Sequence, residues 1–217
     1  MGKVHIDLNN KTILVTGSPG FIGANLVLRL LKELSGGTVI SFDNMNDYYD
    51  PALKEYRLSQ IEKAAEKSPV RHVFVRGSIA DKALVDKVFA EYRPAVVVNL
   101  AAQAGVRYSI DHPDVYIESN LIGFYNILEA CRHFPVEHLV YASSSSVYGG
   151  NKKVPFSTDD KVDNPVSLYA ATKSPTSCWR TAIPSSTISL PPACASSQYT
   201  AQPGVPICSI FPPPRSW

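Results

Sequence analysis

The chain has 217 residues, enough for one domain with a substantial core, and a net charge of +2. Residues 174–217 contain two of the 21 basic residues and none of the 19 acidic ones, so residues 1–173 carry 19 charges of each sign. That balance excludes the basic field of a nucleic-acid-binding protein. No apolar run approaches the roughly 18 residues of a membrane span, and the first residues lack the apolar core of a signal peptide. Cys131 is the one cysteine before residue 174, so we expect a cytoplasmic protein without disulfides, nucleic-acid partner or membrane contact.

Short apolar segments alternate with segments of helical periodicity along residues 1–173. The segments expected to form strands are 12–16, 38–42, 72–75, 95–100 and 138–143. Those expected to form helices are 21–34, 51–67, 82–92 and 115–133, followed by a helix capped by Asn164 with Pro165 at its first position. Because the strands are apolar almost throughout, we expect them to be buried on both faces of a parallel sheet. The predicted fold class is α/β: a doubly wound, Rossmann-like sheet of about five strands, incomplete and followed by an irregular tail.

Three glycines, Gly17, Gly20 and Gly23, join the first expected strand to the first expected helix. A dinucleotide site needs glycines there for a tight turn, for close approach of the pyrophosphate and for close packing of the helix. The helix N-terminus would face the phosphates with free N–H groups. Asp43 follows the second strand, where a carboxylate hydrogen-bonds an adenosine ribose and repels a 2′-phosphate, so NAD is favoured over NADP. The alternatives are a merely tight turn and a solvated loop aspartate.

Two further segments lie at the carboxyl ends of expected strands, where open α/β sheets bind ligands. Residues 99–106 (NLAAQAGV) offer small side chains beside which a flat dinucleotide would fit, although such turns are often only packing. Residues 143–149 (SSSSVYG) offer four consecutive hydroxyls, which are costly to bury without partners. Hydroxyls directed at a substrate oxygen explain these serines better than core packing does.

Tyr169 and Lys173 are four residues apart on the last expected helix and therefore share one of its faces. A neighbouring ammonium stabilises a phenolate, which would make Tyr169 a usable acid–base group near neutral pH. The spacing alone arises often by chance, but here it follows a dinucleotide turn and a serine-rich strand end. The five histidines show no metal-ligand spacing, and Cys131 is better explained as a core residue than as a nucleophile. We therefore predict proton-transfer chemistry without a metal.

Together these motifs resemble the extended short-chain dehydrogenase/reductase family, and within it the nucleotide-sugar epimerases. The blocks DNMNDYYDPALKEYRL, NLAAQAGVRYSI, YASSSSVYG and PVSLYAATK look most like UDP-glucuronate 4-epimerases. The resemblance implies NAD as cofactor and a UDP-sugar of the UDP-glucuronate or UDP-galacturonate type as substrate, with epimerisation at C4. It implies that NAD contacts Gly17, Gly20, Phe21, Ile22, Gly23, Asp43, Asn44, Ser78, Ile79, Ala101, Ala102, Gln103, Asn120, Tyr169 and Lys173.

The same resemblance implies the catalytic roles. Tyr169 would take the proton of the sugar 4-hydroxyl while hydride moves from C4 to NAD, with Lys173 and Ser144 as its catalytic partners. The keto-sugar would then rotate and receive the hydride on its other face. The residues implied to contact the substrate are Ser144, Ser145, Ser146 and Arg107, although Arg107 is equally well explained as a surface arginine.

Two positions refine this expectation. Related dehydratases carry an acidic pair where this chain has Ser145 and Ser146, so dehydration is disfavoured. Ser78 stands where the family commonly has an aspartate against the adenine, which lowers the expected NAD affinity. Members of the family often dimerise, so a homodimer is expected for the intact enzyme. The alternative functions are an NAD-binding fragment without catalysis and another reaction of the family, such as UDP-glucose 4-epimerisation or keto-sugar reduction.

Residues 174–217 differ from the rest of the chain. They hold both tryptophans, three of the four cysteines and nine of the seventeen prolines. Related epimerases continue the helix beyond Lys173 and then add a strand, and this chain shows neither. When the codons of the tail are read one base out of phase, they permit that strand with the sequence LRFFTVYGP. Some positions allow no choice of base, and these also agree with the family sequence: Cys178 followed by Trp179 must give Leu. We therefore predict a frameshift near codon 173. Residues 1–173 would then be a truncated NAD-binding domain, residues 174–217 would be out of frame, and the chain would show no epimerase turnover. The alternative is a genuine Pro/Ser-rich disordered tail.

Overall fold

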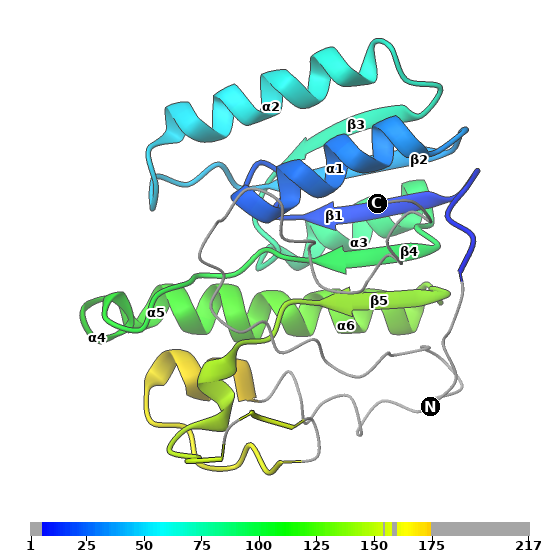
Figure 1. The fold of residues 1–217 in the computed structure, drawn as a ribbon. Helices are drawn as coiled ribbons and strands as arrows, with labels where there is room; N and C mark the ends of the chain where they lie inside the picture. Colours follow the sequence, from blue (N-terminus) through cyan, green and yellow to red (C-terminus); the bar gives the residue numbers. More distant parts are fainter. Residues whose placement is uncertain (1–5, 154, 158–159, 175–217) are drawn as a thin grey trace.

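The computed structural model describes residues 6–153, 155–157 and 160–174, which form a five-stranded parallel sheet between helices (Figure 1). The strands are β1 (Thr12–Thr16), β2 (Thr38–Asp43), β3 (Arg71–Arg76), β4 (Val96–Asn99) and β5 (His138–Tyr141). Their order in the sheet is β3-β2-β1-β4-β5, and every neighbouring pair is parallel. The predicted doubly wound α/β fold is confirmed.

The long helices lie on both faces of this sheet. They are α1 (Phe21–Glu33), α2 (Pro51–Ala65), α3 (Lys82–Tyr92) and α6 (Gly123–His133). In Figure 1, α1 and α2 lie on one face and α3 and α6 lie on the other. The chain therefore crosses from strand to strand through helices, as parallel pairing requires.

The strand sequences explain why both faces are covered. In β4, Val96 and Val98 pack under α1, while Val97 packs on the opposite face against the residues of α3 and α6. Successive side chains of a strand point to opposite faces, so an uninterrupted apolar strand needs cover on both sides. The expected bounds of β1 and α3 match the structure at both ends. The predicted bounds of β2 and β5 differ by one and two residues at one end, and those of β3 and β4 by one residue at each end.

The expected helix at residues 115–133 is present, but its predicted start is wrong by two residues and it is not α-helical throughout. After α4 (Tyr108–Asp111), helical structure runs without a break through α5 (Pro113–Tyr116), a π-helical turn (Ile117–Ile122) and α6. Proline at the first position of α5 fixes where that helix begins. A π-helical turn is rare and is often found at functional sites.

The expected start of the last helix is also wrong. The helix spans residues 168–174, so Asn164 and Pro165 lie in the loop before it. Ser167 is the cap, because its Oγ accepts a hydrogen bond from the Ala170 N–H at 3.0 Å. The backbone N–H of Ala171 donates to the Ser167 carbonyl at 2.8 Å. Of the predicted tail at residues 174–217, all but Ser174 lies outside the described residues.

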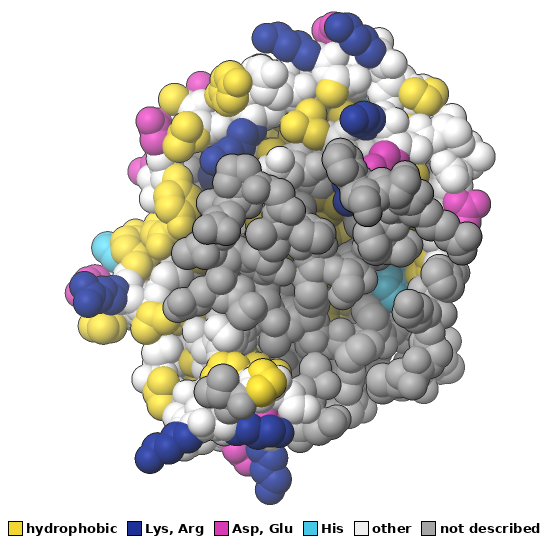
Figure 2. All heavy atoms as spheres, viewed as in Figure 1, with side chains coloured by type: hydrophobic (Ala, Val, Ile, Leu, Met, Phe, Trp, Pro, Cys, Tyr) yellow, Lys and Arg dark blue, Asp and Glu magenta, His cyan; other side chains and the backbone are white. Residues whose placement is uncertain are grey.

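The carboxyl ends of all five strands face the same edge of the sheet, on the left in Figure 1, where α4 and the start of α1 also lie. Figure 2 shows hydrophobic side chains along this side of the described surface, from α2 to α4. Exposed apolar residues in these segments are Phe21, Ile22, Tyr49, Leu53, Val106 and Ile110. Among the described residues, no helix is long and apolar enough to cross a membrane.

Candidate active site

The glycine turn after β1 packs so closely that no side chain fits. Gly17 has φ +70°, and a Cβ there would lie 2.8 Å from the Ala101 nitrogen. A Cβ on Gly23 would overlap the Gly17 carbonyl oxygen, and one on Gly20 would lie 2.9 Å from the same oxygen. No side chain caps α1 at Gly20, and its first turn has no acidic residue. The N-terminus of α1 is therefore open to an anionic ligand.

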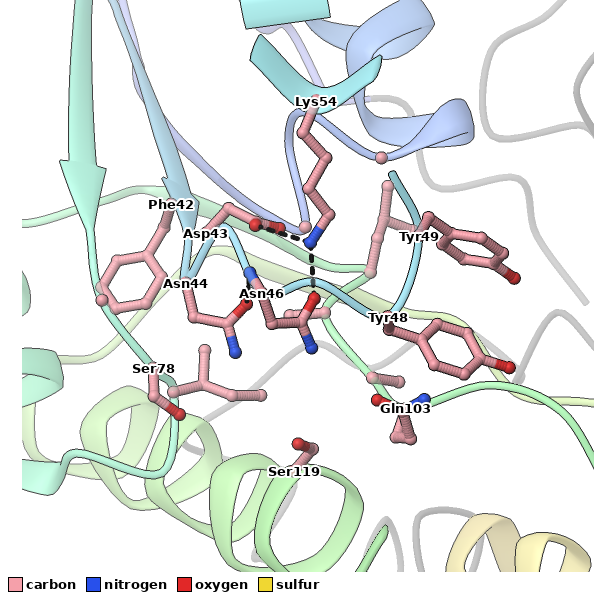
Figure 3. A pocket seen from close by; sticks show the side chains of 17 residues that line it. Phe42, Asp43, Asn44, Asn46, Tyr48, Tyr49, Lys54, Ser78, Gln103 and Ser119 are labelled. Atoms are coloured by element: carbon pink, nitrogen blue, oxygen red, sulfur yellow. Dashed lines mark hydrogen bonds and ion pairs between the residues drawn. The ribbon is translucent and has the colours of Figure 1, made fainter. Parts of the chain in front are cut away.

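A cavity with about 710 Å³ of empty space, part of it open to solvent, runs from this turn along the strand ends (Figure 3). Many of the predicted cofactor residues come together in its wall. They are Gly17, Gly20, Asp43, Asn44, Ser78, Ile79, Ala101, Ala102 and Gln103. The residues come from the ends of β1, β2, β3 and β4, which is where open α/β sheets bind dinucleotides.

The wall of the cavity also holds a buried ion pair that the sequence interpretation missed. Lys54 of α2 places its Nζ 3.3 Å from Asp43 Oδ1 and 2.7 Å from Asn46 Oδ1. The same Asp43 oxygen accepts a hydrogen bond from the Met45 N–H at 2.7 Å. Asp43 and Lys54 are both 8% exposed. The segment containing Lys54 was predicted to be a helix, and periodicity alone did not show that this lysine turns inward.

The turn after β4 is held from several sides. Thr16 Oγ1 donates to Asn99 Oδ1 at 2.7 Å and accepts from the Ala101 N–H at 3.1 Å. The Tyr48 hydroxyl donates to the Ala104 carbonyl at 2.8 Å. Tyr116 brings its hydroxyl within 2.6 Å of the same carbonyl, and burial raises the pKa of Tyr116 to about 12. Tyr116 therefore keeps its proton and stays a donor at any ordinary pH.

Asn120, in the π-helical turn, links this wall to the helix of Tyr169 and Lys173. Its Oδ1 accepts from the Gln103 N–H at 2.8 Å. Its Nδ2 donates to the Gln103 carbonyl at 3.0 Å and to Thr172 Oγ1 at 3.1 Å. The side-chain amide thus bonds to protein with its oxygen and both of its hydrogens. Asn120 was predicted to contact the cofactor, and it lines a smaller hollow beside the main cavity.

Lys173 lies in that smaller hollow, together with Ala101, Ala102 and Asn120. It is 6% exposed, and its Nζ donates to the Ala142 carbonyl at 3.3 Å. Burial lowers the pKa of Lys173 to about 8. Its partner Tyr169 is half-buried, with its ring centroid 6.0 Å from that of Tyr116 in an edge-on contact.

The serine segment begins a short 3₁₀ helix, Ser145–Tyr148, which Ser144 caps. Ser144 Oγ accepts from the Ser146 N–H at 3.2 Å and lies 3.1 Å from Ser146 Oγ. Ser144, Ser145 and Ser146 are half-buried and line neither cavity. Arg107 is exposed before α4 and lines neither cavity as well.

Predicted residues at the start of α1 have a different place. Phe21 is 58% exposed and Ile22 is 41% exposed, outside the cavity wall, while Gly23 packs against the glycine turn. Gly23 therefore belongs to the packed turn, and Phe21 and Ile22 lie on the exposed surface beside it.

Buried polar atoms without partners lie along the same strand ends. Among the described residues, they include Ser18 Oγ and Ser143 Oγ. These residues follow β1 and β5, are at most 5% exposed and line neither cavity. The fit to a cofactor therefore depends on the cavity wall: the glycine turn has no room for a Cβ, the N-terminus of α1 is uncapped, and Asp43 lies in the wall. These features fit a dinucleotide.

Comparison with known proteins covers the same part of the chain. Residues 14–183 match the family model described as GDP-mannose 4,6 dehydratase. Protein CapI of Staphylococcus aureus is 53% identical over 161 residues, which are 74% of this chain and 46% of that protein. UDP-glucuronate 4-epimerase 4 of Arabidopsis thaliana is 48% identical over 167 residues, which are 76% of this chain and 36% of that protein. The chain thus spans less than half the length of these curated relatives.

A solved structure agrees with the fold. The NAD complex of UDP-glucose 4-epimerase from Thermus thermophilus is similar with a TM-score of 0.65 and 32% identity, over 82% of this chain and 53% of that one. The family match covers well over half of the chain, and the described site carries the glycine turn and the Tyr169–Lys173 helix. The chain therefore belongs to the GDP-mannose 4,6 dehydratase family, within the extended short-chain dehydrogenases/reductases.

Proposed function

We propose that residues 1–173 are the NAD-binding part of an epimerase that acts at C4 of a UDP-sugar of the UDP-glucuronate type. One observation carries the proposal: a single wall joins the dinucleotide cavity to the helix of Tyr169 and Lys173. Gln103 lines the cavity, and Asn120 bonds to both Gln103 and Thr172. Four relatives named UDP-glucuronate 4-epimerase are 46–48% identical, which supports this substrate class.

Different residues of the chain would bind the cofactor and transfer the proton. Gly17, Gly20 and the N-terminus of α1 would hold the pyrophosphate, and Asp43 would hold the adenosine ribose. When bound, NAD would supply the hydride acceptor and donor at the sugar carbon. Tyr169 would take the proton of the 4-hydroxyl, and Lys173, as an ammonium, would stabilise the phenolate that results.

The serine segment supports epimerisation over dehydration. Water elimination needs an acid and a base beside the sugar, and the 3₁₀ helix offers Ser145 and Ser146 instead. Ser144, which caps this helix, would hydrogen-bond the sugar near its 4-hydroxyl. Arg107 would serve a substrate carboxylate only if the sugar reached the exposed surface before α4.

We further propose that residues 174–217 are out of frame, so that this chain binds NAD but does not turn over a UDP-sugar. The proposed setting is the cytoplasm, with a homodimer for the intact enzyme and no nucleic-acid partner. Burial raises the pKa of the Cys131 thiol to about 12, which agrees with a role in the core and not as a nucleophile.

The test compares the 217-residue chain with a version whose reading frame is restored after codon 173. Isothermal titration with NAD measures binding, and separation of UDP-glucuronate from UDP-galacturonate measures turnover. We expect NAD binding by both proteins and turnover by the restored one alone. Turnover by the 217-residue chain would contradict the frame proposal. If the restored protein turned over only another UDP-sugar in a substrate panel, the proposed substrate would be wrong.

A further inference from the structure

The charge of Asp43 is balanced inside the cavity wall. Asp43 is the carboxylate that would face an adenosine ribose, and Lys54 lies 3.3 Å from it (Figure 3). Both side chains are about nine-tenths buried, at 10% and 9% exposure. At such burial an ion pair is weakly screened by salt, so the two charges act together on any ligand in the cavity.

Both groups keep hydrogen-bonding capacity for a ligand. The recorded bonds of Asp43 fall on Oδ1, from Met45 and Lys54, which leaves Oδ2 as an acceptor. Lys54 has three N–H donors, and Asp43 and Asn46 account for two of them. One acceptor and one donor side by side match the two neighbouring hydroxyls of a ribose. A phosphate in place of one hydroxyl would meet the same donor but would also meet the carboxylate.

We propose that Lys54 is a specificity-determining residue of the cofactor site, because its charge opposes the repulsion that Asp43 exerts on a 2′-phosphate. The proposal rests on the NAD site proposed above. In the unaltered pair the net charge is zero, so Lys54 weakens the repulsion by which Asp43 keeps a 2′-phosphate out. Removing the carboxylate leaves a buried cation facing the ligand, and that cation binds a phosphate. Removing the cation leaves a carboxylate that rejects a phosphate more strongly.

A merely structural role for Lys54 makes a different prediction. Lys54 also ties α2 to the loop after β2 through Asn46. If that were its whole role, its loss would weaken NAD and NADP binding by the same factor. The ratio of the two dissociation constants therefore separates the two roles, since misfolding or loosening of the loop does not change it selectively.

The experiment measures NAD and NADP binding to the full 217-residue chain by isothermal titration. The variants are Asp43→Asn, Lys54→Met, the double variant, and Asp43→Asn combined with Lys63→Met. Lys63 is an exposed lysine of the same helix, so its removal is a matched loss of charge. Lys54→Gln in the Asp43→Asn background repeats the test with a polar side chain, and the thermal shift that each nucleotide produces is a second readout.

We expect Asp43→Asn to shift the NADP:NAD preference toward NADP by roughly tenfold or more, because a buried cation then faces the phosphate without compensation. The double variant should lose that gain, and the Lys63 control should keep it. Equal NADP preference in Asp43→Asn and the double variant, with NAD binding intact in the unaltered chain, would overturn this inference alone. Absence of NAD binding in the unaltered chain would overturn the proposed cofactor site and this inference with it.

Discussion

The two halves of the strand-end edge are held in different ways. On the side proposed to bind adenosine, Gly17 and Gly23 bring backbone against backbone, with no room for a Cβ. On the side proposed to bind the sugar, residues 168–174 form a short helix whose contacts include side-chain hydrogen bonds from Asn120 to Thr172 and from Lys173 to Ala142. The glycine turn is thus held by close backbone packing. The 168–174 helix is held in part by hydrogen bonds of single side chains.

The two outer strands of the described sheet also differ, in how polar and how buried they are. β3 carries Arg71, His72 and Arg76 and is only half-buried, as expected at the edge of a sheet. β5 is the other outer strand among the described residues, yet its Leu139, Val140 and Tyr141 are buried. A strand of that composition is typical of a sheet interior. Among the described residues, the half proposed to bind adenosine therefore ends in a polar strand, and the half proposed to bind the sugar ends in an apolar one.

The largest expected effect comes from adding atoms to the half proposed to bind adenosine. Gly23→Val should abolish NAD binding and lower the free energy of unfolding by about 3 kcal/mol, because the new side chain overlaps the Gly17 carbonyl. Urea unfolding and NAD titration measure the two effects. Gly150→Val is the matched control, since a Cβ on Gly150 meets nothing within 4 Å. Equal losses in both variants would show that the glycine turn is not held by shape.

The next effect concerns Lys173 and pH. Its pKa is lowered from 10.5 to about 8 in the folded protein, so between these values the unfolded chain binds one more proton than the folded one. Stability from this group should therefore rise with pH, by on the order of 3 kcal/mol across that window, and should be lowest below pH 8. Lys173→Met removes the dependence. Unfolding in urea at pH 7 and pH 10.5 measures it, and parallel pH curves for the two proteins would contradict the prediction.

A smaller effect is expected where the two halves join. Asn120→Leu leaves the Gln103 N–H and carbonyl without their partner and should cost about 1–3 kcal/mol. It should also speed hydrogen exchange at the Ala171 amide, which belongs to the 168–174 helix. Asn126→Leu is the comparison, because Asn126 is equally buried but bonds to Ile79 and Ala80. Faster exchange at Ala171 in both variants would show that Asn120 has no special link to that helix.

The smallest effect tests one hydroxyl. Tyr116→Phe removes one of two hydroxyl donors to the Ala104 carbonyl, the other being Tyr48, and should lower the free energy of unfolding by about 1 kcal/mol. Tyr56→Phe, at a tyrosine that is 63% exposed, should change it by less than about 0.5 kcal/mol. Urea unfolding of the two variants side by side provides the measurement. A larger loss from Tyr56→Phe would reverse the expected order.

Much of the fold was predictable because its strands are continuous apolar runs. The segments TILVT and AVVVNL indicated strands buried on both faces, and Gly17 to Gly23 indicated the turn between β1 and α1. Residues that act through main-chain geometry were thus visible in the sequence. Lys54 was not, because a lysine on a polar helix is usually solvated, and only the packing of α2 shows that it turns toward Asp43.

The predicted start of the last helix was wrong for a similar reason. Asn164 with Pro165 is a good local signal for a helix start, but Ser167 makes the hydrogen bond that caps the helix. The π-helical turn has no sequence signature of its own. The proposed role of Tyr169 and Lys173 and the frame of residues 174–217 stay predictions, and the restored reading frame described above tests both.

The π-helical turn also affects the direction in which side chains before it point relative to side chains after it. Tyr116 and Ile127 are eleven residues apart, about three turns of an uninterrupted α-helix, and would share one face. The wider turn lies between them, and both side chains are buried, Ile127 among core residues of α3 and α6 and Tyr116 against Ala104 and Tyr169. Deleting one residue from 117–122 would rotate one set against the other by about 100°. Sequence length within this turn is therefore as constrained as residue identity, and a homologue with one residue fewer there would need a different clamp on the cofactor wall.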